Sequence, residues 1–92
     1  MDINLHQLRI FQAVAQYGGY SRAADALYLS QPAVSLQVKA LEKSIGLPLF
    51  ELVGRTLHLT EAGRELLSYS ERIFTLLEET RLVMEELGGG RR

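Results

Sequence analysis

The chain has 92 residues, enough for one small domain and one further element, and its hydrophobic content of 47% and charged content of 23% are those of a folded protein. It contains no cysteine, which excludes disulfides, a cysteine-based zinc finger and a thiol nucleophile. No apolar run approaches the ~18 residues of a membrane span, and the N-terminus lacks a secretory segment, so we expect a cytoplasmic protein.

The net charge of −1 is divided unevenly along the chain. Residues 1–58 carry five Lys or Arg against four Asp or Glu, whereas residues 59–92 carry five Arg against seven Glu. The first part therefore has a balance of +1 and the second a balance of −2. Because phosphate repels an acidic surface, the second part is not expected to lie against nucleic acid.

A first helix is predicted to begin after Asn4, a favourable N-cap residue with Gln7 as its capping-box partner. It carries one apolar stripe, formed by Leu5, Leu8, Phe11, Val14 and Ala15. Gly18-Gly19 is expected to end this helix, because glycine readily adopts the left-handed conformation found after many helices.

Two further helices are predicted from the N-cap residues Ser21 and Ser30. The first of them is short and ends at Leu27. The second carries Pro32 in its first turn, where a proline is tolerated, and stops at Gly46.

The third helix has two different faces when its residues are placed 100° apart. Its inner face is apolar and consists of Val34, Val38, Leu41 and Ile45. Its outer face consists of Pro32, Leu36, Lys39 and Lys43, with Ser35 at the edge. Ammonium, hydroxyl and apolar groups together suit the DNA major groove. Each of these residues alone is equally typical of a solvated surface, so the interpretation depends on the order of the elements.

The stretch LPLFELVGRTLHLT, residues 47–60, alternates around Gly54-Arg55 and predicts a small β-hairpin. Thr60 then begins a long helix that continues to Leu87 and is broken by the glycines at 88–90, before Arg91-Arg92. This order predicts a mainly α fold: a winged helix-turn-helix with a β-hairpin wing, followed by a long dimerisation helix.

Apolar residues recur in the long helix at steps of three and four, as in a coiled-coil seam. Those expected to form a dimer contact are Leu66, Tyr69, Ile73, Leu76, Leu77, Val83, Met84 and Leu87. A helix of ~28 residues would be ~42 Å long, more than a domain of this size can cover. We therefore expect a homodimer, the alternative being that the helix folds back as a core helix of its own chain.

Residues 5–65 resemble the N-terminal DNA-binding domain of LysR-type bacterial transcriptional regulators. The matching words are LRIFQAVAQYGGYSRAADALYLSQPAVSLQVKALEKSIGLPLF and LTEAGREL, and within the family they are most similar to regulators of carbon-fixation operons. The resemblance implies a DNA-binding domain at 1–59, a linker helix at 60–87 that pairs antiparallel with a second copy, and a glycine-rich hinge or added end at 88–92. It also implies an effector domain that this sequence lacks, through which a small molecule would act, and a tetrameric full-length protein.

The resemblance also implies which residues meet promoter DNA. The expected set is Ser21, Arg22, Ser30, Gln31, Pro32, Ser35, Leu36, Lys39, Lys43 and Arg55. Arg55 matches the wing arginine that enters the minor groove. This chain departs from many members at Leu52 and at Leu36, where they carry arginine. Arg55 should therefore supply more of the wing's interaction.

No enzyme is indicated, because the sequence has no nucleophile–base pair, no phosphate-binding glycine loop and no metal cluster. His6 and His58 lack companions at ligand spacing, and no cofactor or metal is expected. The remaining alternative is a protein-interaction module that pairs through the long helix without binding DNA.

Overall fold

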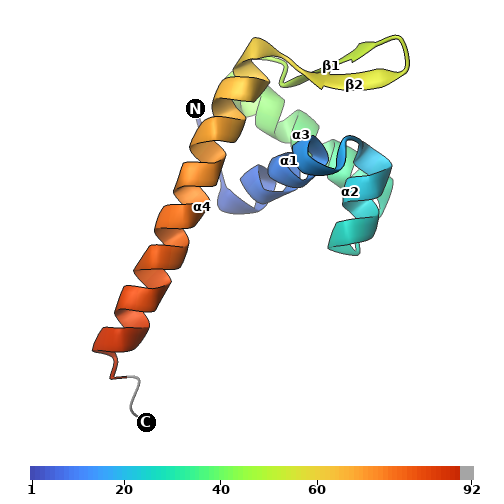
Figure 1. Ribbon diagram of the computed structural model, residues 1–92. Coiled ribbons are helices and arrows are strands. Elements are labelled where there is room, and N and C mark those ends of the chain that lie inside the picture. Colours follow the sequence, from blue (N-terminus) through green and yellow to red (C-terminus); the bar gives the residue numbers. More distant parts are fainter. Residues whose placement is uncertain (90–92) are drawn as a thin grey trace.

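The computed structural model describes residues 1–89. Within them, the elements are α1 (Leu5–Tyr17), α2 (Tyr20–Leu27), α3 (Gln31–Ile45), β1 (Phe50–Val53), β2 (Thr56–Leu59) and α4 (Glu61–Leu87). The first three helices pack together, the hairpin extends to one side, and α4 runs past them as a long rod (Figure 1). The molecule measures 54 × 26 × 18 Å. The mainly α, winged helix-turn-helix prediction is confirmed.

Local capping signals account for most of the helix boundaries. The side chain of Asn4 accepts a hydrogen bond from the backbone of Gln7 (2.7 Å), and Ser30 and Thr60 do the same for α3 and α4. Gly18 ends α1 in the left-handed conformation, with φ of 76°. The predicted glycine break begins at Gly88, and its remainder, residues 90–92, lies outside the described residues.

The predicted start of α2 is wrong. The helix begins at Tyr20 with Gly19 at its N-cap, no side chain caps it, and Ser21 lies inside the first turn. Tyr20 packs against the core, and its ring meets Phe50 edge-on with the centroids 6.0 Å apart. Burying this ring places Tyr20 on the helix, so tertiary packing overrides the capping preference of Ser21.

Two adjoining apolar clusters form the core. One joins α1, α2 and α3 through Ile10, Ala13, Val14, Ala23, Ala24, Val34 and Val38. The other joins α1 and α3 to the start of the wing through Leu8, Phe11, Leu41 and Leu49, and the first half of α4 packs against it. The stripe predicted for α1 is confirmed at Leu8, Phe11 and Val14, but Leu5 is exposed.

The predicted hairpin is confirmed, with Phe50 opposite Leu59 and Val53 opposite Thr56. Gly54 occupies the turn with φ of 64°, a conformation that suits glycine. At the base, the Thr60 hydroxyl donates to the carbonyl of Pro48 (2.6 Å), and the Thr60 backbone donates to that of Leu49 (3.0 Å). Most wing residues are exposed, so the hairpin is held at its base.

The first half of α4 lies against α1, whereas its second half leaves the domain (Figure 1). The Ser70 side chain is fully buried and its hydroxyl donates to the side-chain oxygen of Gln12. The Arg9 guanidinium stacks over the Phe74 ring at 4.2 Å. The fold-back alternative is therefore half correct: one half of α4 is a core helix, and the other is not. Among the described residues, no helix is long and apolar enough to cross a membrane.

Candidate nucleic-acid interface

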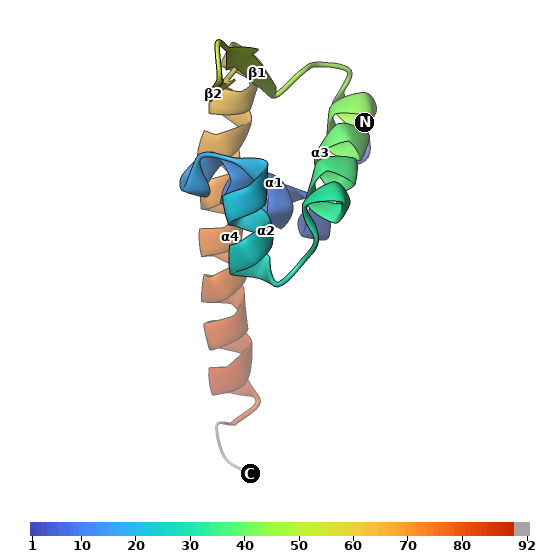
Figure 2. The same ribbon diagram turned by 90° about the vertical axis from the view of Figure 1, so that its right-hand side faces the viewer.

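Helix α3 presents the outer face that the sequence predicted. Val34, Val38 and Leu41 are fully buried, and Ile45 is half-buried. On the opposite side Pro32, Leu36, Lys39 and Lys43 are exposed, and Ser35 is half-buried. Figure 2 shows α3 on the side of the domain away from α4, with α1 between them. The outer face of α3 is therefore open to a ligand as large as a duplex.

The start of α3 has its own hydrogen-bonding pattern. The Ser30 oxygen accepts the cap bond from Ala33 (3.2 Å), so its hydroxyl proton can still be donated to a phosphate. Gln31 is exposed beside it. The Gln37 side chain instead accepts a bond from Gln7 of α1 (3.1 Å), so it is used inside the domain. Leu36 lies on the outer face beside Ser35 and Lys39 and is 67% exposed.

Ser21 and Arg22 lie exposed in the first turn of α2, near the helix end that carries the positive dipole charge. The turn between α2 and α3 contains a residue that the sequence reasoning missed. Tyr28 has φ of 58° and is 94% exposed. Nothing in its residue type signals this conformation, because Gly and Asn are the residues that usually adopt it.

The wing carries Arg55 at its tip, directly after Gly54, and the guanidinium is exposed. Leu52 and Val53 beside it are exposed as well. His58 faces solvent across the hairpin from Glu51, and residues 1–89 contain no His, Cys, Asp and Glu group that could hold a metal ion. Arg55 is therefore the cation that the wing presents.

A second residue missed from the sequence lies beneath the wing. The Glu42 carboxylate, from α3, accepts hydrogen bonds from the backbone N–H groups of Leu49 (2.7 Å) and Phe50 (3.4 Å). Burial, and then the negative charge of Glu42, raise the pKa of the Tyr20 hydroxyl above its usual range. Both ionisable groups thus lie near the base of the hairpin.

The residues predicted for dimerisation fall into two groups on α4. Leu66 and Ile73 are half-buried against the chain's own core. The rest are exposed, namely Tyr69, Leu76, Leu77, Val83, Met84 and Leu87. Arg81 bonds to Glu78 and Glu85 on its own helix, whereas Arg72 stacks on Tyr69 at 4.9 Å. The Arg81 guanidinium lowers the pKa of Glu78 through a hydrogen bond.

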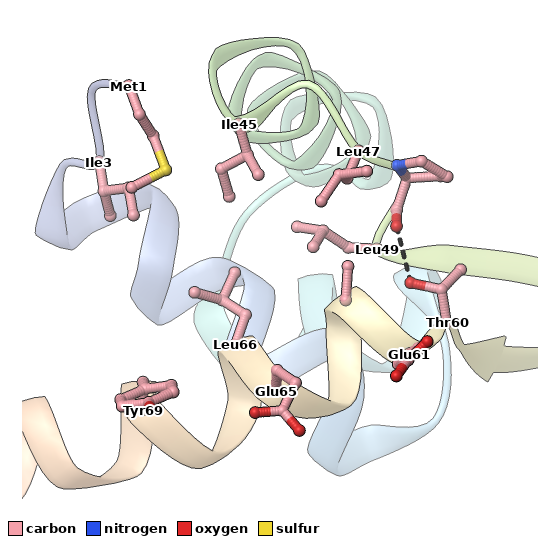
Figure 3. Close-up of a pocket in the computed structure, with 12 residues that line it drawn as sticks. Met1, Ile3, Ile45, Leu47, Leu49, Thr60, Glu61, Glu65, Leu66 and Tyr69 are labelled. Atoms are coloured by element: carbon pink, nitrogen blue, oxygen red, sulfur yellow. Dashed lines mark hydrogen bonds between the residues drawn. The ribbon is translucent and has the colours of Figure 1, made fainter.

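An apolar groove of about 610 Å³ adjoins the exposed face of α4 (Figure 3). Met1, Ile3, Ile45 and Leu47 line one side, and Leu66 points into it from α4. Ala62 and Tyr69 of α4 complete the same wall. The groove therefore continues the exposed apolar face of α4 toward the N-terminal end of that helix.

Comparison with known proteins accounts for this arrangement. Residues 5–64 match the sequence profile of a family described as "Bacterial regulatory helix-turn-helix protein, lysR family". The chain belongs to the LysR family. The similarity inferred from the motifs is thereby confirmed.

The curated relatives of this LysR-family chain include regulators with a narrower designation. It is 54% identical over 89 residues to the RuBisCO operon transcriptional regulator of Allochromatium vinosum, which covers 97% of this chain and 30% of the relative. It is 57% identical over 87 residues to a probable RuBisCO transcriptional regulator of Synechocystis sp., and the match covers 95% of this chain and 25% of the relative. The chain thus spans less than a third of the length of these relatives. Their names agree with the predicted likeness to carbon-fixation regulators.

Solved LysR-family structures share the fold. A structure described as a BenM_DBD/catB site 1 DNA complex superposes with a TM-score of 0.91 at 27% identity, over 98% of this chain and 97% of that one. A CbnR_DBD–DNA complex superposes with a TM-score of 0.87 at 34% identity, over 94% of this chain and 99% of that one. The domain is therefore that of a transcriptional regulator and not of an enzyme.

Proposed function

We propose that this domain binds double-stranded promoter DNA in a sequence-specific manner, as a homodimer. The outer face of α3 carries the proposal, because it holds Pro32, Leu36, Lys39 and Lys43 exposed, with Ser35 half-buried at its edge, on a helix whose other side is fixed in the core. Lysines contact phosphate or guanine, a hydroxyl contacts phosphate or a base edge, and an apolar side chain contacts the thymine methyl. The two DNA complexes named above are consistent with this role.

The hairpin wing would enter the adjacent minor groove. Its tip carries Arg55, and a guanidinium is drawn to the negative potential of a narrow, A/T-rich groove. Ser21 and Arg22 at the start of α2, together with Ser30 and Gln31 at the start of α3, would contact the phosphates and base edges around the major groove. These contacts fix the position of α3 on the duplex.

The exposed face of α4 supports dimerisation through that helix. Apolar or small residues occur alternately four and three residues apart, which is a heptad repeat: Ala62, Leu66, Tyr69, Ile73, Leu76, Thr80, Val83 and Leu87. Leu77 and Met84 widen the stripe. Leu87 is 71% exposed, and within residues 1–89 the second half of α4 extends beyond the rest of the domain. A second copy would cover it.

The groove favours antiparallel pairing of the two α4 helices. In an antiparallel pair, Val83 and Leu87 of one copy lie against Leu66 and Ala62 of the other, where the groove opens. In a parallel pair the grooves of the two copies would lie opposite each other, and neither would receive the exposed Val83 and Leu87. The antiparallel register also brings Arg72 of one copy beside Glu79 of the other, twice per dimer. Charge and shape therefore support the same arrangement.

The remaining parts of the proposal concern the whole protein. We propose that it regulates a carbon-fixation operon, since its relatives are named for RuBisCO operons. A C-terminal domain absent from this chain would bind the small-molecule effector and would support a tetramer. A regulator that binds bacterial promoters works in the cytoplasm.

Footprinting of the domain on genomic fragments tests the proposal, with fragments upstream of carbon-fixation genes included. We expect one protected region with two related half-sites, and an affinity that falls steeply with salt. A dimeric protein that protects no fragment at low salt would instead be an interaction module that pairs through α4.

A further inference from the structure

The wing needs an anchor if Arg55 is to meet the minor groove at a fixed distance from α3. The strands have four residues each, and a two-stranded hairpin of this size has little stability of its own. Arg55 lies about 16 Å from Phe50 along the strand, at the usual strand rise. A rotation of about 10° at the base would move the tip by about 3 Å, enough to lose a hydrogen bond.

Glu42 supplies this anchor from the recognition helix itself. It lies one residue after the buried Leu41, and its carboxylate accepts the backbone N–H of Leu49 at 2.7 Å and that of Phe50 at 3.4 Å. Leu49 is fully buried and Phe50 is the first residue of β1. A charge-assisted bond to the backbone is stronger than a neutral one and leaves the strand little freedom to turn. The carboxylate is thus a polar link from α3 to the first strand of the wing.

Packing around the link holds it in place. The Phe50 ring meets Phe11 of α1 at 5.4 Å and Tyr20 of α2 at 6.0 Å, so the strand begins in a fixed aromatic cluster. Beyond Phe50 the rest of β1 is exposed, while Leu57 and Leu59 of β2 are half-buried against the two core clusters. The base of the wing is therefore fixed on β1 at Phe50, where Glu42 bonds, and on β2 by these two leucines.

We propose that Glu42 is a positioning residue, which sets the wing relative to α3 so that Arg55 reaches the minor groove while α3 lies in the major groove. This inference rests on the proposed DNA binding. Glu42 does not touch DNA. Its effect on binding passes through Arg55, whereas contacts made by α3 are independent of it.

A double-mutant cycle tests this role, using the whole chain and the duplex found by footprinting. In the wild-type background, Arg55→Ala should weaken binding on the order of tenfold and lower the salt slope by about one unit. Glu42→Ala, which removes the acceptor, should produce nearly the same loss, because the tip no longer reaches the groove. In the Glu42→Ala background, Arg55→Ala should cause little further loss.

Controls separate positioning from folding. Glu51→Ala removes an exposed carboxylate of the wing without touching the link, so Arg55 should keep its full effect there. Glu42→Asp keeps the charge but shortens the reach, and it should uncouple Arg55 as Glu42→Ala does. Thermal unfolding of each variant shows whether it is folded. If the contacts of α3 are intact, replacing a thymine under Leu36 with uracil, which lacks the methyl group, should still weaken binding in both Glu42 variants.

Two results would overturn the inference. Equal losses on Arg55→Ala in the wild-type and Glu42 backgrounds would show that the wing keeps its place without the link. If Arg55→Ala in the wild-type background causes no loss of DNA affinity, the wing does not contact the DNA. The proposed binding through α3 would be unaffected by that result. Absence of all binding would instead remove the proposed function.

Discussion

The hydroxyl of Ser70 donates a hydrogen bond to the side chain of Gln12, and this bond joins the middle of α4 to the centre of α1. Ser70 is fully buried, so its hydroxyl depends on Gln12 for a hydrogen-bond partner. Leu67 and Phe74, three and four residues away along the same helix, pack against the core cluster of Leu8, Phe11, Leu41 and Leu49. The bond therefore fixes the rotation of α4 about its axis, and with it which residues of α4 remain exposed.

Ser70→Ala should leave the side-chain oxygen of the half-buried Gln12 without its donor. We expect the free energy of unfolding to fall by about 1–3 kcal/mol. Urea unfolding measures it, with Ser68→Ala, an exposed position on the same helix, as the control. An equal and small effect of both substitutions would mean that the bond does not stabilise the contact between α1 and α4.

Gly63→Ala should destabilise the fold, although it adds only one methyl group. A Cβ atom at Gly63 would lie 2.2 Å from the backbone oxygen of Leu49, so the start of α4 or the base of the wing must move. We expect a loss of about 1–3 kcal/mol in the free energy of unfolding. Gly19→Ala is the control, because nothing lies within 4 Å of its added Cβ. Similar unfolding curves for the two variants would contradict the prediction.

Leu76→Glu tests the proposed dimer without disturbing the domain. Leu76 is exposed, whereas Ile73 also packs against the chain's own core and would confuse folding with pairing. A carboxylate buried at the seam should cost on the order of several kcal/mol of association. Sedimentation at micromolar concentration should show a wild-type dimer and a folded monomeric variant. If both the wild type and the variant are dimeric, the dimer interface does not include this face of α4.

Cysteine cross-linking tests the antiparallel register, since the chain has no native cysteine. Positions 62 and 87 are about 37 Å apart within one helix and cannot bond to each other there. Ala62→Cys with Leu87→Cys should therefore form disulfides only between copies, while Leu87→Cys alone should not cross-link. Cross-linking of the single variant would indicate a parallel pair. Arg72→Glu should weaken the dimer, and adding Glu79→Arg should restore it.

Leu36 is predicted to read a base through apolar contact. A leucine can meet a thymine methyl but offers no hydrogen bond, and one buried methyl is worth on the order of 1 kcal/mol. Replacing the contacted thymine with uracil should weaken binding several-fold at one position per half-site, and Leu36→Ala should abolish this difference. Ser35→Ala should cost affinity without any thymine-to-uracil signature. A uracil scan with no sensitive position would contradict the prediction.

The sequence predicted most of the fold because its boundaries depend on local chemistry. Asn4, Ser30 and Thr60 cap helices wherever they precede a helical stretch, and the alternation around Gly54 needs only the hairpin itself. The outer face of α3 could be predicted for the same reason, since helical periodicity alone separates it from Val34, Val38 and Leu41.

The features that were missed depend on partners distant in the sequence. Tyr20 begins α2 because its ring meets Phe50, and Glu42 holds a strand that follows in a separate element. The division of α4 into two faces depends on where α1 lies, as the burial of Ser70 shows. Spacing within one helix cannot distinguish a residue that faces its own domain from one that faces another chain.

The close packing of α4 on α1 has a mechanical consequence. Within residues 1–89 there is no hinge between α4 and the DNA-binding part of the domain, because Gly63 packs on the base of the wing and Ser70 and Phe74 pack on α1, which in turn carries α3. A torque applied at Leu87 would therefore turn α3 and the wing as a single rigid arm. In the proposed dimer the length of α4 sets the distance between the two DNA-binding arms. Seven residues added to α4 would increase this distance by about 10 Å, or about three base pairs, and would preserve the heptad repeat of the dimer contact.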